Sequence, residues 1–113
     1  MQQYYTTKEK ASLHDTTMPL LKAMYTEFKE LAKKKPEAAV SKSKIKLINR
    51  LLEKINIILK DEKSIEFLDM LEEDDIPQIS DVTLILSQYV AAMAAFQQSH
   101  YGWDGKDNNW FIK

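Results

Sequence analysis

The two histidines, His14 and His100, have the widest chemical range of any residues in this sequence, because imidazole can act as a general base or a metal ligand near neutral pH. Helical metal sites commonly place two ligands four residues apart, as in H-E-x-x-H, and neither histidine belongs to such a pair. Asp104 follows His100 at that spacing, but Gly102 between them favours the end of a helix. We therefore expect no metal site and no cofactor at either histidine.

Carboxylates and hydroxyls are also poorly placed for catalysis. Di-iron helical bundles use Glu-x-x-His pairs, whereas Glu53 is followed at that spacing by Asn56, and Glu66 by Asp69. The chain has no cysteine, and its serines lie in neither a nucleophile elbow nor a phosphate-binding loop. The sequence therefore predicts a cofactor-free protein without enzymatic activity. The alternative is an enzyme with a buried site between helices, whose polar candidates are Tyr89, Asn56, Gln88 and His100.

Acidic and basic residues separate along the chain. Between residues 61 and 81 there are nine acidic residues and one lysine, whereas residues 22–46 contain eight lysines and three acidic residues. The densest acidic run is predicted to steer and bind a basic protein partner, and it consists of Glu72, Glu73, Asp74 and Asp75. Complementarity between the two oppositely charged regions, within one chain or between copies, is the simpler interpretation.

Large apolar side chains are concentrated in residues 101–113. Chain termini are usually polar unless they are packed, so these side chains need a cover. They either fold back over the end of a helical bundle or anchor a partner or a second copy, a role that Trp and Tyr often take. The residues that we select as partner anchors are Trp103, Trp110 and Phe111.

The composition indicates one domain. The chain has 113 residues, of which 44% are hydrophobic, with two glycines and a net charge of -1. This length supports one hydrophobic core, and so few glycines disfavour phosphate-binding loops and tight hairpins. The N-terminal residues lack the apolar stretch of a signal peptide, and the apolar segment 82–96 is shorter than the roughly 20 residues of a membrane span. We expect a cytoplasmic protein that binds no membrane.

Apolar residues recur at steps of three and four in four segments, which is the spacing of amphipathic helices. These segments are residues 17–34, 41–60, 64–73 and 80–101. Short connections favour antiparallel neighbours. The predicted fold is all-α, a compact antiparallel bundle of about four helices within a single domain, residues 16–113. Residues 1–15 are expected to form a flexible N-terminal segment, and residues 102–113 an aromatic C-terminal tail.

These features together predict a small protein-interaction module, of the kind that serves as an inhibitor, an immunity-type protein or an accessory subunit. Its partner would be another protein or a second copy in a homo-oligomer. The alternative is a nucleic-acid-binding or regulatory module that uses the lysines of residues 33–46. Of the basic residues only Arg50 has the planar guanidinium that suits bidentate recognition of phosphates and bases, so we favour the protein partner.

Overall fold

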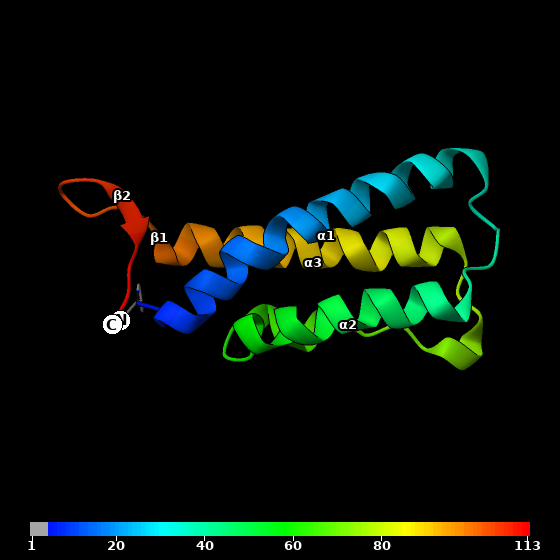
Figure 1. Ribbon diagram of the computed structural model, residues 1–113, viewed down its shortest axis with the longest axis horizontal. Coiled ribbons are helices and arrows are strands. Elements are labelled where there is room, and N and C mark those ends of the chain that lie inside the picture. The colour runs from blue at the N-terminus through cyan, green and yellow to red at the C-terminus, as the bar shows by residue number, and fades with distance from the viewer. Residues whose placement is uncertain (1–4) are drawn as a thin grey trace.

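The computed structural model describes residues 5–113, which form a rod with extents of 49 × 23 × 22 Å (Figure 1). The structure is 69% helical, which confirms the helical fold class. In chain order, its elements are α1 (Lys8–Lys34), α2 (Lys42–Leu59), the 3-10 helices η1 (Lys63–Phe67) and η2 (Glu73–Asp75), α3 (Ile79–His100), and the strands β1 (Tyr101–Trp103) and β2 (Asn108–Trp110).

Helix α1 begins at Lys8, earlier than the Thr17 expected from the sequence. Its N-cap is Thr7, whose hydroxyl accepts a hydrogen bond of 3.1 Å from the backbone N–H three residues later. The Thr17 hydroxyl, which could have capped a helix, donates instead to the Leu13 carbonyl of the preceding turn. Residues 8–15 of the segment that we expected to be flexible therefore belong to α1, and its first four residues lie outside the described part of the chain.

Helix α2 lies within the predicted segment 41–60. Ser41 is its N-cap, because the Ser41 hydroxyl accepts a hydrogen bond from the Lys44 N–H over 3.3 Å. The wide apolar face needs neighbours on two sides, and α1 and α3 supply them. The buried side chains of α2 are Ile45, Ile48, Leu52, Ile55, Ile58 and Leu59.

The predicted helix over residues 64–73 is wrong. After η1 the chain is extended at Leu68, with φ -105° and ψ 126°. The Asn49 side chain on α2 then accepts a hydrogen bond from the Leu71 N–H over 3.0 Å and donates one to the Leu71 carbonyl over 2.8 Å. The Asn49 amide thus pairs with both backbone groups of Leu71, as a neighbouring β-strand would. Residues 68–72 therefore pass α2 in an extended conformation and form no α-helix. In residues 5–113 the bundle therefore has three α-helices instead of four.

The connection between α2 and α3 also changes the predicted topology. Residues 60–78 run back alongside α2, so α2 and α3 are parallel to each other and α1 is antiparallel to both (Figure 1). A bridge between Ala39 and Gln78 holds the starts of α2 and α3 at one end of the rod. The Ile79 N–H donates to the Ala38 carbonyl there, over 2.9 Å. The all-antiparallel arrangement would have required a short connection between α2 and α3.

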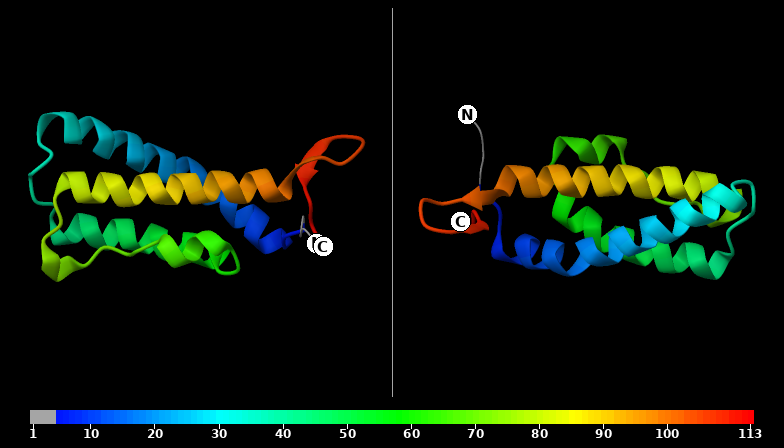
Figure 2. Two further views of the ribbon diagram at one scale, coloured as in Figure 1. Left: turned by 180° about the vertical axis from the view of Figure 1, so that it is seen from behind. Right: turned by 90° about the horizontal axis from the view of Figure 1, so that it is seen from above.

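Helix α3 is the central element and packs mainly against α1. The hydrophobic core between the three helices includes Leu21, Leu86, Met93 and Phe96, each of which is at most 1% exposed. Seen from behind, α3 lies in front of α1, and residues 60–78 pass below it (Figure 2, left). The inner sides of all three helices are thus used in mutual contact.

Candidate partner-binding site

A β-hairpin follows α3 directly and projects from the end of the bundle (Figure 1). Strands β1 and β2 pair antiparallel, with Tyr101 opposite Trp110 and Trp103 opposite Asn108. Directly opposite residues lie on one face of a sheet, and so do residues two apart on a strand. One face of this ordered hairpin therefore carries three of the aromatic side chains that were expected to cover the bundle or to anchor a partner: Tyr101, Trp103 and Trp110.

Trp110 anchors this hairpin to the bundle. Its indole N–H lies 3.2 Å from both carboxylate oxygens of Asp15 on α1. Its ring lies 5.0 Å from the His14 ring and 5.9 Å from the Phe96 ring, measured between centroids. Such packing of an aromatic pair contributes about 0.5–1.5 kcal/mol beyond the area buried. Of the predicted partner anchors, Trp110 therefore has a role inside the fold.

Phe111 is also used within the fold. It is half-buried, and its ring would lie 3.4 Å from a β-carbon placed on Gly102 of β1. The Phe111 N–H donates to the His100 carbonyl over 2.7 Å, and its carbonyl accepts from the Thr6 N–H over the same distance. Thr6 in turn accepts from the Lys113 N–H over 3.1 Å, so the two ends of the described chain are bound together beside the hairpin.

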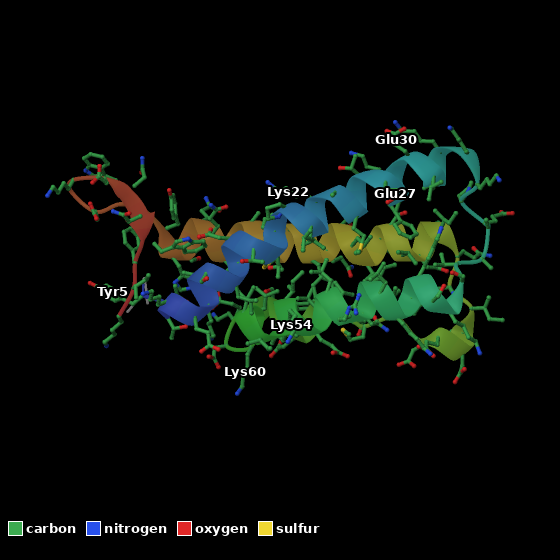
Figure 3. All side chains as sticks on the ribbon, viewed as in Figure 1. Tyr5, Lys22, Glu27, Glu30, Lys54 and Lys60 are labelled. Carbon is green, nitrogen blue, oxygen red and sulfur yellow. The ribbon has the colours of Figure 1, made fainter. Side chains whose placement is uncertain are left out.

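Trp103 is the predicted anchor that remains exposed. It is 64% accessible to solvent, compared with 37% for Tyr101 on the same strand. The Tyr101 ring packs on Trp110 and meets its ring edge to face, with 5.3 Å between the centroids. Two further apolar side chains are exposed at this end of the rod: Tyr5 at 59% and Ile112 at 45% (Figure 3).

The turn of the hairpin is organised by the Asp104 carboxylate. One oxygen accepts hydrogen bonds from the Lys106 N–H (2.9 Å) and the Asp107 N–H (2.8 Å), and the other accepts one from the Asn109 side chain (2.9 Å). These bonds, of which the one from Asp107 is the strongest cause, hold the pKa of Asp104 below its ordinary value of 3.8. Gly105 completes the turn with a φ of +99°, which a side chain would disfavour.

Beneath Trp110 lies His14, which is 2% exposed. Its Nε2–H donates to the Met93 carbonyl of α3 over 2.9 Å, and its ring stacks on Phe96 at 5.7 Å. Burial lowers the pKa of His14 from 6.5, because the charged imidazolium is poorly solvated there, although the Met93 carbonyl and the charge of Asp15 oppose this shift. The neutral His14 ring is thus a packing surface for the hairpin.

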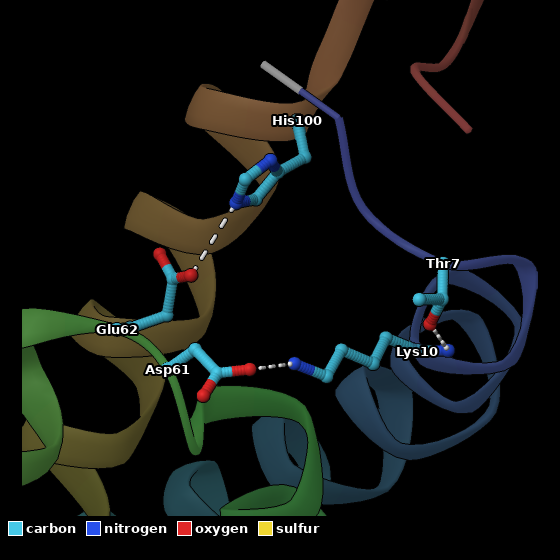
Figure 4. A network of polar contacts seen from close by, with 5 residues as sticks. All are labelled: Thr7, Lys10, Asp61, Glu62 and His100. Atoms are coloured by element: carbon cyan, nitrogen blue, oxygen red, sulfur yellow. Dashed lines mark hydrogen bonds and ion pairs between the residues drawn. The ribbon is translucent and has the colours of Figure 1, made fainter. Parts of the chain in front are cut away.

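One ion pair and one histidine–carboxylate contact join the turn after α2 to the same end of the bundle (Figure 4). Lys10 Nζ lies 3.0 Å from Asp61 Oδ2, and His100 Nε2 lies 3.4 Å from Glu62 Oε2. The hydrogen bond from Lys10, followed by its charge, lowers the pKa of Asp61 below 3.8. Residues of α1, of α3 and of the turn after α2 therefore meet beneath the hairpin and support it.

The predicted acidic run lies elsewhere. Glu72, Asp74 and Asp75 are exposed and Glu73 is half-buried, on and beside η2, near the starts of α2 and α3. The hairpin lies at the opposite end of the 49 Å rod (Figure 1). The structure therefore does not bring the acidic residues and the aromatic anchors into one site. Next to the run, Ile76 is 62% exposed and has a left-handed backbone, with φ 49° and ψ 65°.

The lysine-rich region lies at the same end as the acidic run. A shallow hollow of about 490 Å³ on α2 is lined by Ser43, Lys44, Lys46, Leu47 and Arg50. Because η2 also packs against α2, the oppositely charged basic and acidic regions are neighbours in space. Among the ion pairs of residues 5–113, none joins them directly. Other charged side chains of α1 and α2 project from the sides of the rod, such as Lys22, Glu27 and Lys54 (Figure 3).

The polar candidates for a buried enzyme site are divided between the core, the exposed side of α3 and the hairpin end. The Asn56 amide donates to the Tyr89 hydroxyl over 3.1 Å within the core, and burial raises the pKa of Tyr89 above 10.0. Gln88 is exposed on α3, and His100 pairs with Glu62 at the hairpin end. Within the described residues, no group of three or more His, Asp or Glu side chains is placed to hold a metal ion.

Comparisons of this chain with protein-family models, curated proteins and solved structures find no match. By length and composition, α3 is long and apolar enough to cross a membrane, a property that it shares with core helices of folded domains. Here its inner face packs against α1 and α2.

Three residues of this end were not selected from the sequence: Asp15, Asp104 and Thr6. Asp15 acts through Trp110, which is far from it in the chain, and no local pattern signals such a contact. Asp104 could have been found, because aspartate followed closely by glycine is a turn signal. Thr6 acts through its backbone, which the identity of the residue does not reveal.

Proposed function

We propose that this chain is a protein-interaction module without enzymatic activity, and that it binds a partner protein through the exposed Trp103 side of its C-terminal hairpin. The observation that carries this proposal is the contrast between Trp110, which is bonded to Asp15, and Trp103, which is 64% exposed on the same face. Tryptophan is one of the residue types enriched at binding hot spots.

The fixed hairpin reduces the conformational entropy that binding would cost. The Asp104 turn and the Trp110 anchor fix the hairpin before any partner arrives, so little conformational entropy is lost on binding. Tyr101, Tyr5 and Ile112 supply further exposed apolar surface at this end. The proposed partner presents an apolar pocket large enough for an indole ring. The acidic run at the far end would steer a basic partner or touch a separate part of it.

The proposal is tested by affinity purification from the native host with three baits. These are the unaltered chain, Trp103→Ala, and Leu20→Ala as a control, because Leu20 on α1 is 55% exposed. A partner should be recovered with the first and third baits and lost with the second. With the purified partner, Trp103→Ala should cost about 2 kcal/mol or more, roughly thirtyfold in affinity. Equal recovery of the same partner with all three baits would refute the proposal.

Nucleic-acid binding is the second candidate function, supported by the hollow around Lys44, Lys46 and Arg50. Cations arranged around an open hollow can contact phosphates without reading sequence. This candidate predicts retention of DNA or RNA at low salt, an affinity that falls steeply as salt rises, and loss of binding in a Lys44→Gln/Lys46→Gln variant. The absence of any retention at low ionic strength would remove it.

A further inference from the structure

A groove lies between α3 and η1. These two elements face the viewer when the molecule is seen from behind (Figure 2, left). The groove has a volume of about 310 Å³, and its lining includes Phe67 and Leu68 from the η1 side and Gln88, Ala91 and Ala95 from α3. We call it the α3–η1 groove. Phe67 is the most exposed large apolar residue of the described chain, at 73%, and it stands at the rim of this groove.

The outer face of α3 continues the same surface. Leu84, Gln88, Ala91 and Ala95 recur at steps of three and four, all are exposed, and Leu84 is 61% accessible. Between residues 82 and 99 the helix has no charged side chain. Small side chains at positions 91 and 95 allow another backbone to approach closely. Exposed helix faces are usually charged, so this face has the composition of an interface.

We propose that the α3–η1 groove is occupied by a second copy of this chain, related by a two-fold axis, with Phe67 of each copy inserted into the groove of the other. A two-fold interface requires a surface that is complementary to itself. The exposed Phe67 ring beside an apolar hollow meets this requirement, because projection and recess are adjacent on one chain. The Gln88 amide meets it too, since an amide both donates and accepts hydrogen bonds and can pair with its own copy.

The charges beside the groove favour the same occupant. In a 3-10 helix side chains three residues apart lie in line, so η1 has three rows. Ile65 packs on the core, Ser64 and Phe67 line the groove, and Lys63 and Glu66 form the exposed outer row. If the two-fold axis at the groove is perpendicular to η1, the two η1 segments run antiparallel and Lys63 of each copy lies opposite Glu66 of the other.

The size of the face is adequate for a dimer. A helix of 22 residues is about 33 Å long, and the rod is 23 × 22 Å across. A copy lying flat on this side can approach the roughly 800 Å² per partner that stable dimers bury. A lipid surface is the other occupant that an uncharged helix face could suit. In that case Gln88 in the groove, and Lys63 and Glu66 on the exposed outer row of η1, would each have to lose water without a matching partner.

The oligomeric state in solution tests this inference. Light scattering should give twice the chain mass of 13.2 kDa at sub-millimolar concentration. Ala91→Arg puts a charge into the groove at an exposed position, and Phe67→Ala removes the inserted ring, so each should weaken dimerisation about tenfold or more. Leu20→Arg, an equally drastic change on the exposed surface of α1, should leave the dimer intact. Circular dichroism confirms that each variant is folded.

A charge exchange tests the two-fold pairing itself. Lys63→Glu and Glu66→Lys should each weaken self-association, whereas a mixture of the two variants should form a mixed dimer, because each copy then offers the charge that the other lacks. A monomeric wild-type chain, or an unchanged dimer in Ala91→Arg, would overturn the inference. So would a monomer that floats with phosphatidylcholine vesicles, which would assign the groove to lipid. The affinity purification with the Trp103→Ala bait does not depend on whether the chain dimerises, so the proposed function is tested separately from this inference.

Discussion

The indole N–H of Trp110 lies 3.2 Å from each carboxylate oxygen of Asp15, although almost the whole chain separates the two residues. This contact fastens the C-terminal hairpin to the first helix. It also decides which aromatic residues remain available: Trp110 is fixed, and Trp103 on the same face is free. The orientation of the proposed binding surface therefore depends on one hydrogen-bonded pair at its base.

Asp15→Ala should loosen the hairpin more than the bundle. It removes a charge-assisted acceptor at the surface, so we expect a loss of roughly 1 kcal/mol in unfolding free energy. Hydrogen exchange should accelerate at the amides of β1 and β2, while the amides of α2 stay protected. Thr16→Ala, at the neighbouring exposed position, is the control, because its hydroxyl bonds within the helix to Ser12. Equal protection of the hairpin in both variants would show that the Asp15 contact does not hold it.

Asp104→Ala should disorder the hairpin turn and leave the thermal midpoint of the bundle nearly unchanged. The variant loses the acceptor for three hydrogen bonds. Asp107→Ala is the matched control, since Asp107 takes part in the turn through its backbone. In the unaltered chain, the folded pKa of Asp104 is lowered, so the contribution of its turn is complete above 3.8 and is lost as the pH falls below that value. Amide chemical shifts of Lys106 and Asp107 would report this titration.

Acid should weaken the fold through His14. Because the folded pKa lies below 6.5, the folded state binds a proton less readily than the unfolded state. The stability contributed by neutral His14 is therefore complete above 6.5 and decreases as the pH falls below it. Denaturant unfolding of the unaltered chain and of His14→Gln, measured above and below 6.5, separates this effect from other titrations. A pH dependence that is the same in both proteins would contradict it.

Ile76 is held in a conformation that a β-branched residue disfavours, by about 1–2 kcal/mol. Its side chain is exposed, so little packing compensates for this strain. Ile76→Gly should raise the unfolding free energy by roughly 0.5–1 kcal/mol, after the extra freedom of glycine in the unfolded state is counted. Ile76→Ala keeps the β-carbon and should gain less. If Ile76→Gly is the less stable of the two in denaturant, the strain is absent.

The sequence predicted α2 well because its apolar residues recur regularly over the whole helix and are buried in the core. It failed at the start of α1, where the buried positions are Ala11 and His14, which do not form an apolar stripe. The scarcity of glycine disfavours hairpins in general, yet Gly105 alone supplies the positive φ that this turn needs. The sequence predicts the aromatic anchors only as a group. Trp110 is fixed and Trp103 is exposed because Trp110 contacts Asp15 on α1, and no local sequence pattern reveals that contact.

The predicted third helix failed for a reason that can be tested at Asn49. Its side chain satisfies both backbone groups of Leu71, so a neighbouring helix, and not the local sequence, decides the conformation of residues 68–72. Asn49→Ala leaves these groups without their partner and should cost about 1–3 kcal/mol. Glu53→Ala, one turn further along the exposed side of α2, should change stability by less than about 0.5 kcal/mol. If Asn49→Ala is as stable as Glu53→Ala and its helical signal is unchanged, the extended crossover is held by the packing of Leu71 alone, and the Asn49 amide is dispensable.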